Sequence, residues 1–267
     1  MTAIHPTAVV DPRAELGAGV RVGPHAVVGP EVVLGDDCEV GEGAVLRGPS
    51  AIGKGNVFFP HCVVGTDPQD LKYKGERTSL RMGDGNSVRE FVTINRGTAT
   101  GSGQTVVGDR NLFMACSHVA HDCEIGNGNV LSNNVLLGGH IAIEDNAVLS
   151  GAAAVNHFVT IGAAALIGGL TRIVQDVPPY LIVEGNPAKV RGVNLVRLQR
   201  LSVPEDRMQS LQDAYRALYR SDKPLLVSME EVRARGSLTP EVQNLLAFLD
   251  RSLTGINGRF RETLRKD

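Results

Sequence analysis

Four of the seven histidines in this 267-residue chain fall within 40 residues, namely His118, His121, His140 and His157. His121 and His157 are 36 residues apart, and Gly139 lies midway between them. An imidazole titrates near neutral pH and suits general-base catalysis, while an accessible glycine N–H can bind a developing oxyanion. We therefore predict that His121 is a general base and that the Gly139 N–H binds an oxyanion. Asp122 would stabilise the imidazolium or fix its tautomer, which requires a chain corner because strand neighbours point oppositely.

A metal site is the alternative interpretation of the same histidines. His118, His121 and His140 have the composition of a three-histidine zinc site. The cysteines lack CxxC spacing and are predicted to be structural, and they are Cys38, Cys62, Cys116 and Cys123.

A six-residue repeat accounts for the spacing of these candidates. Every sixth residue is apolar from Ile4 to Val64, from Met82 to Ile94 and from Val107 to Ile173, which makes 26 hexads. This period fits neither a helix nor an alternating strand, so it predicts a solenoid in which three flat walls form an 18-residue coil. The first residue of each hexad would point inward with a small fifth residue beside it. Gly, which fills the second position in 13 hexads, and Asn are expected to supply the positive-φ corners.

The repeat is interrupted twice and then ends. Residues 70–81 and 98–106 leave the pattern. We favour a function for the first loop, which is polar. For the second loop, a function and a solvated connection without one are equally expected. Pro178 and Pro179 are predicted to end the strand ladder. Helical patterns follow, starting at a capping box over 202–205, at Ser228 and at Thr239. We predict a β-helix over residues 1–190 and a helical domain over 191–267.

Composition and charge exclude several classes of protein. The net charge of −2 argues against a nucleic-acid binder, and no run of 18 apolar residues exists that would predict a membrane span. The N-terminal residues lack a signal-peptide pattern, which predicts a cytoplasmic location. Residues 191–267 hold 14 basic and 10 acidic side chains, whereas residues 1–190 hold 13 and 19. A basic helical domain suits an acidic partner.

Five short segments carry a family resemblance, and they are QDLKY (69–73), HVAHDC (118–123), GGH (138–140), QDVPPY (175–180) and GVN (192–194). In this order and spacing the chain resembles the acyl-[acyl-carrier-protein]–UDP-N-acetylglucosamine O-acyltransferases, which are hexapeptide-repeat acyltransferases that start lipid A biosynthesis. The resemblance covers essentially the whole chain. It implies a mainly β fold, a left-handed parallel β-helix of hexapeptide repeats with a C-terminal α-helical domain.

The resemblance also implies a reaction. His121 would take the proton of the 3-hydroxyl of UDP-N-acetylglucosamine, which attacks the thioester of a 3-hydroxyacyl chain on acyl-carrier protein. The Gly139 N–H would hold the oxyanion and Asp122 would support His121. No acyl-enzyme, metal or separate cofactor is implied, because phosphopantetheine arrives with the carrier protein. The family sites lie between the subunits of a homotrimer.

Substrate-binding residues are carried over from the family in the same way. Those expected to bind the nucleotide sugar or line the acyl groove are Gln69, Asp70, Lys72, His118, His140 and His157. Asn194 and Arg200 match nucleotide contacts, and Gly169 matches an acyl-chain ruler whose small size implies a longer chain. The chain departs from the family pattern at Asn156, Val196 and Leu201, which leaves nucleotide affinity and the choice of a hydroxyl or amino acceptor open. The alternatives are a β-helical zinc carbonic anhydrase, the related N-acyltransferase and a non-catalytic solenoid scaffold. The N-acyltransferase would differ from this chain by a separate N-terminal uridine-binding domain before the hexads.

Overall fold

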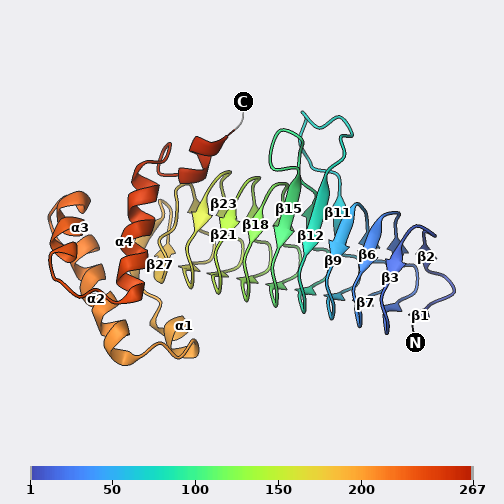
Figure 1. Cartoon of the computed structure of the whole chain (residues 1–267), viewed down its shortest axis with the longest axis horizontal. Helices are drawn as coiled ribbons and strands as arrows, with labels where there is room; N and C mark the ends of the chain where they lie inside the picture. The colour runs from blue at the N-terminus through green and yellow to red at the C-terminus, as the bar shows by residue number, and fades with distance from the viewer. Residues whose placement is uncertain (1, 266–267) are drawn as a thin grey trace.

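The computed structural model describes residues 2–265, which form a long left-handed β-helix capped at one end by helices (Figure 1). Most strands are only two residues long, and three strands complete one coil. In the two-residue strands the apolar first residue of the hexad is the second residue of the strand. Beyond the first coil this residue is buried in the core, as in β17 (His118–Val119), where Val119 is fully buried. The predicted fold class is therefore confirmed.

The strands stack into three sheets that form the walls of the prism. The first sheet contains β1 (Ala3–Ile4), β4 (Arg21–Val22), β7 (Glu39–Val40), β10 (Val57–Phe58), β13 (Ser87–Val88), β16 (Leu112–Phe113), β19 (Val130–Leu131), β22 (Val148–Leu149), β25 (Leu166–Ile167), β27 (Leu181–Glu184) and β28 (Lys189–Val193). The second contains β2 (Val9–Val10), β5 (Val27–Val28), β8 (Val45–Leu46), β11 (Val63–Thr66), β14 (Thr93–Asn95), β17, β20 (Leu136–Leu137), β23 (Ala154–Val155) and β26 (Arg172–Ile173). The third contains β3 (Glu15–Leu16), β6 (Val32–Leu34), β9 (Ser50–Ile52), β12 (Ser79–Met82), β15 (Gln104–Val107), β18 (Glu124–Ile125), β21 (Ala142–Ile143) and β24 (Thr160–Ile161).

The register between coils is the predicted 18 residues around the histidine cluster. Val119 pairs with Leu137, and Leu137 pairs with Val155. The small fifth residues are buried beside them, for example Cys123 and Ala153. Residues 18 positions apart along these coils therefore lie one above another.

Glycine and asparagine supply the positive φ at some corners, as expected, for example at Gly128 (φ 63) and Asn146 (φ 64). The positive-φ residue is the fourth of the hexad, and it is often a larger residue such as Asp122 (φ 58), His140 (φ 63) or Phe158 (φ 63). A second-position glycine has another role, as at Gly35, where a Cβ would lie 2.6 Å from the carbonyl carbon of Gly53. Glycine is needed there because the next coil passes too close for any side chain.

The two interruptions are loops that project on the same side of the β-helix (Figure 1). Because β12 already begins at Ser79, the first excursion covers 67–78 rather than 70–81. The second covers 96–103, since β15 begins at Gln104.

The strand ladder continues beyond the prolines, so that prediction is wrong. Ile182 of β27 pairs in parallel with Leu166 of β25, and β28 adds an antiparallel strand. The prolines precede β27 and therefore remove no hydrogen bond from its ladder. The predicted domain boundary after residue 190 falls inside β28.

The C-terminal part contains α1 (Leu195–Arg200), α2 (Glu205–Tyr219), α3 (Leu225–Arg233), α4 (Pro240–Leu253) and the 3₁₀ helix η1 (Phe260–Leu264). Leu211, Met229 and Leu245 are fully buried in a second core between these helices. No helix among residues 2–265 is long and apolar enough to cross a membrane.

Two of the three predicted helix starts are wrong. The capping box fails because Ser202 ends α1: its φ is 57, its N–H bonds to Gln199, and the Val203 N–H bonds to Leu198. Instead α2 follows Pro204, and α3 follows Pro224 rather than starting at Ser228. The start of α4 at Thr239 is confirmed.

Candidate active site

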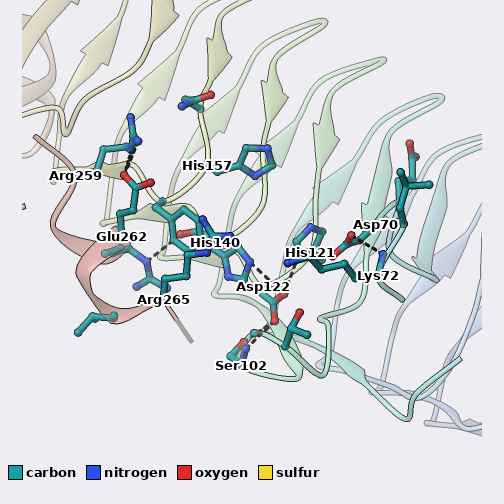
Figure 2. Close-up of a pocket in the computed structure, with 18 residues that line it drawn as sticks. Asp70, Lys72, Ser102, His121, Asp122, His140, His157, Arg259, Glu262 and Arg265 are labelled. Carbon is teal, nitrogen blue, oxygen red and sulfur yellow. Dashed lines mark hydrogen bonds and ion pairs between the residues drawn. The ribbon is translucent and has the colours of Figure 1, made fainter. Parts of the chain in front are cut away.

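A pocket of about 830 Å³ lies where the two loops, the corner between the second and third sheets, and the C-terminal segment meet (Figure 2). Loop 67–78 contributes Gln69, Asp70 and Lys72, and loop 96–103 contributes Ser102 among others. The coils contribute His121, Asp122, His140, Asn156, His157 and Phe158. The predicted histidine site is therefore a cavity walled by segments far apart in the sequence.

His121 and Asp122 form a hydrogen-bonded pair at this corner. The Nδ1 of His121 lies 2.8 Å from Oδ2 of Asp122, although the two residues are adjacent in sequence. The positive φ of Asp122 provides the corner that this pairing requires. A carboxylate accepts only, so Nδ1 carries the proton and Nε2 is left as the basic nitrogen.

Loop 96–103 encloses the Asp122 carboxylate. Thr98 donates its backbone N–H at 3.1 Å and its hydroxyl at 2.6 Å, and Ser102 donates its N–H at 2.9 Å and its hydroxyl at 3.0 Å. Burial by itself raises the pKa of Asp122, but the hydrogen bonds from His121 and Thr98 outweigh it and lower the pKa to about 2. Asp122 therefore keeps its negative charge at neutral pH. Loop 96–103, for which the sequence favoured neither a function nor a plain solvated connection, holds this carboxylate in place.

Gly139 lies directly against the His121 ring, as the 18-residue coil predicts. A Cβ on Gly139 would lie 2.5 Å from Cε1 and 2.8 Å from Nε2 of His121. The Gly139 N–H, however, is not free, because it donates to Nδ1 of His157 at 2.9 Å. The expectation of an accessible N–H is thus wrong for this structure. A substrate oxygen that used this donor would take the place of the His157 nitrogen.

His140 forms the wall beside this pair. Its ring is stacked on Phe158, with centroids 4.4 Å apart, and meets His121 edge-on at 5.1 Å. Burial lowers the pKa of His140 to about 4 despite the nearby Asp122 charge, so this ring is neutral at pH 7. Burial also lowers the pKa of His157. Neutral rings leave the Asp122 charge to act on His121.

The arrangement suits deprotonation of a hydroxyl more directly than metal binding. Ligand atoms of His121, Asp122 and His140 lie within 4.8 Å of one another and form the one such group among residues 2–265. The Asp122 oxygens already accept several hydrogen bonds, and His118, part of the proposed zinc set, is not in this group.

Comparisons with known proteins match nearly the whole chain to one family. The family model of UDP-N-acetylglucosamine O-acyltransferase domain 2 matches residues 176–257, and the bacterial transferase hexapeptide model matches 13–48 and 104–139. The chain is 48% identical over 259 residues to the acyl-[acyl-carrier-protein]–UDP-N-acetylglucosamine O-acyltransferase of Gloeothece citriformis, covering 97% of this chain and 92% of that one.

The chain belongs to the family of acyl-[acyl-carrier-protein]–UDP-N-acetylglucosamine O-acyltransferases. A UDP-N-acetylglucosamine acyltransferase structure from Bacteroides fragilis matches with a TM-score of 0.89 and 38% identity, over 92% of this chain and 96% of that one. The Arabidopsis UDP-N-acetylglucosamine acyltransferase matches with a TM-score of 0.77 and 36% identity, over 94% and 97%.

Five of the predicted site residues do not line the pocket of the single chain, and one of them is Gly139, which is buried. His118 lies on the outer face of β17, where its Nδ1 is 2.7 Å from the Thr93 hydroxyl, and burial lowers its pKa. Gly169 lies at the corner between the first and second sheets and is exposed. Asn194 is buried and accepts the N–H of Arg197 at the start of α1, while Arg200 is exposed at the end of that helix.

The sequence interpretation missed one wall of the pocket. Arg259, Arg261 and Arg265 come from the C-terminal segment, which the repeat does not reach. Phe158, by contrast, could have been found, because it lies 18 residues after His140 in the same corner register.

Proposed function

We propose that this chain transfers a 3-hydroxyacyl chain from acyl-carrier protein to the 3-hydroxyl of UDP-N-acetylglucosamine, the first step of lipid A biosynthesis. The observation that carries the proposal is the His121–Asp122 pair, which lines a large pocket and whose imidazole packs against the buried Gly139. The names of relatives such as the Gloeothece enzyme specify the carrier, the nucleotide sugar and an oxygen acceptor, and this favours the hydroxyl over the amino acceptor.

In this mechanism Nε2 of His121 accepts the proton of the sugar hydroxyl as its oxygen attacks the thioester carbonyl. The positive charge that develops on the imidazole faces the Asp122 carboxylate, which is 2.8 Å away and fully ionised at neutral pH. The carbonyl oxygen becomes an oxyanion and takes the Gly139 N–H in place of His157. Collapse of the intermediate expels the carrier thiolate, which takes the proton from His121. No covalent acyl-enzyme is required.

The remaining substrate contacts follow from the walls of the pocket. Asp70 and Lys72, with Gln69 beside them, face the histidines from loop 67–78 and would bind the sugar (Figure 2). His140 and His157 would line the path of the substrate between the loop and the C-terminal segment.

We further propose a homotrimer. His121 lies at the corner between the second and third sheets, and Gly169 lies at the corner between the first and second. Asn194, just before the helix that contains Arg200, donates to the Ala164 carbonyl at the corner between the third and first sheets. Packing three prisms about an axis parallel to the β-helix brings different corners of neighbouring copies together. Nucleotide contacts by Asn194 and Arg200, and the ruler role of Gly169, then belong to a site shared between copies. Sedimentation equilibrium at three times the chain mass would support this, and a monomer would contradict it.

The decisive experiment measures acyl transfer to UDP-N-acetylglucosamine from a set of acyl-carrier proteins, with products identified by mass spectrometry. We expect His121→Ala to reduce turnover by a factor of about 10³ or more while the melting temperature and oligomeric state are retained. His5→Ala, at an exposed histidine in the first coil, is the matched control. Near-normal turnover in His121→Ala would refute the mechanism, and a wild-type chain that transfers no acyl group would refute the function.

A further inference from the structure

Residues 254–265, which follow α4, form an arm that returns along the β-helix toward the pocket (Figure 1). Its base is fixed to the last coil by backbone hydrogen bonds. Asp176 donates its N–H to the Gly258 carbonyl at 2.8 Å, and its carboxylate accepts the Phe260 N–H at 2.9 Å. Arg259 donates to the carbonyl of Val174 at 2.9 Å. The arm is therefore an ordered part of the fold.

Arg261 attaches the arm to two coils farther along. Its Nε donates to the His140 carbonyl at 3.0 Å, and its guanidinium pairs with both carboxylate oxygens of Glu124 at 2.7 and 3.1 Å. His140, which Arg261 contacts, in turn lies against the His121–Asp122 pair. The arm thus forms the wall of the pocket opposite loop 67–78, as Figure 2 shows.

The arm carries more positive charge than its own acidic neighbours neutralise. Arg259 pairs with Glu262 and Arg261 pairs with Glu124, but Arg265 forms no ion pair within residues 2–265. Burial and then the His121 charge lower the pKa of His157, and the Arg259 charge adds to them. At the end of the pocket that faces loop 67–78, Arg265 therefore places a guanidinium without an ion pair among the described residues, and Arg259 places one that also donates to Glu262.

We propose that Arg259 and Arg265 of this arm form a phosphate-binding subsite of the pocket. This inference rests on the proposed function, because both proposed substrates carry phosphate. UDP-N-acetylglucosamine has a diphosphate, and the carrier's phosphopantetheine has a phosphodiester. A guanidinium offers a planar pair of N–H donors that matches phosphate oxygens. The Arg259 side chain is only 12% exposed, which strengthens such a contact relative to open solvent, whereas Arg265 is exposed. A phosphate held here orients the substrate toward His121 from the side opposite Lys72.

The test uses the full chain with Arg265→Gln, Arg265→Glu and the Arg259→Gln/Arg265→Gln double variant. Arg235→Gln, at an exposed arginine that does not line the pocket, is the matched control. Each variant is assayed with acyl-4′-phosphopantetheine and with acyl-pantetheine, which is the same thioester without the phosphate. We expect the KM for one substrate to rise about 10-fold in Arg265→Gln and further in the other two variants, with Arg235→Gln unchanged. Arg265→Lys should recover part of the loss.

The two donors identify the source of the phosphate. A KM rise for UDP-N-acetylglucosamine with either donor assigns the subsite to the nucleotide diphosphate. A rise for acyl-4′-phosphopantetheine that is absent with acyl-pantetheine assigns it to the phosphopantetheine. KM values within two-fold of wild type for all substrates in the double variant and in Arg265→Glu would overturn the subsite.

Failure of the subsite and failure of the proposed function remain distinguishable. Transfer by the wild-type chain tests the function alone. Calorimetric titration with UDP-N-acetylglucosamine and with 4′-phosphopantetheine tests the subsite without turnover. We expect at least one of these ligands to bind about 10-fold more weakly to Arg265→Gln than to wild type, and equal affinities for both would overturn the subsite.

Discussion

Replacing Gly139 with alanine tests the stacking of one coil on the next at its most sensitive point. The added Cβ would lie 2.5 Å from Cε1, 2.8 Å from Nε2 and 3.0 Å from Nδ1 of His121, whereas ordinary contact begins near 3.4 Å. The ring must therefore move by about 0.9 Å relative to the Asp122 carboxylate and the substrate. A displacement of about 1 Å in a reacting group lowers the rate about 10²-fold, which corresponds to about 2.7 kcal/mol of activation free energy.

The fold should tolerate this substitution. Gly139 does not have a positive φ, so an alanine fits its backbone, and the free energy of unfolding should change by no more than about 1 kcal/mol. The matched control is Gly151→Ala, at the same third position of its hexad, where a Cβ would meet nothing closer than the Asn133 carbonyl oxygen at 3.6 Å. The assay is steady-state acyl transfer, with thermal unfolding measured alongside. The reasoning is refuted if Gly139→Ala keeps kcat/KM within three-fold of wild type, or if Gly151→Ala loses as much.

Three further predictions concern other parts of the site. The pKa of His140 is near 4 in the folded chain and 6.5 when unfolded. Above pH 6.5 the ring is neutral in both states, so its burial costs the folded chain no stability through protonation. On the order of 3 kcal/mol is lost as the pH falls to 4, and His140→Gln should flatten this part of a urea-unfolding profile measured against pH. Thr98→Val and Ser102→Ala each remove a hydroxyl donor from Asp122, which should raise its pKa, weaken its support of the protonated His121 ring and lower kcat about 3- to 10-fold. A lowered melting temperature with unchanged kcat would indicate a merely structural role. Gly169→Met should shorten the preferred acyl chain in a competition among acyl-carrier proteins, and an unchanged preference would contradict the ruler.

The hexad repeat made the walls of the β-helix predictable, because each inward position depends only on local periodicity. Once 18 residues complete a coil, His121, Gly139 and His157 must lie in one column, and the structure confirms the contact of Gly139 with both histidines. The same register places Asp122, His140 and Phe158 in one column of positive-φ corners, which provides the corner that pairing of Asp122 with His121 requires. Loop positions and helix ends were less predictable, since they depend on contacts such as those that make Ser202 end α1.

The sequence by itself determined the solenoid and the column of His121, Gly139 and His157, because a period of six repeated 26 times buries its apolar residues in coils of 18. The family followed from short segments such as HVAHDC (118–123) and QDVPPY (175–180). Only the tertiary structure decided that loop 96–103 encloses Asp122 and that His157 occupies the Gly139 N–H. It also decided that Arg261 reaches Glu124 across 137 residues of sequence. These contacts join segments outside the repeat to the coils, so they depend on how the excursions and the arm fold back in space.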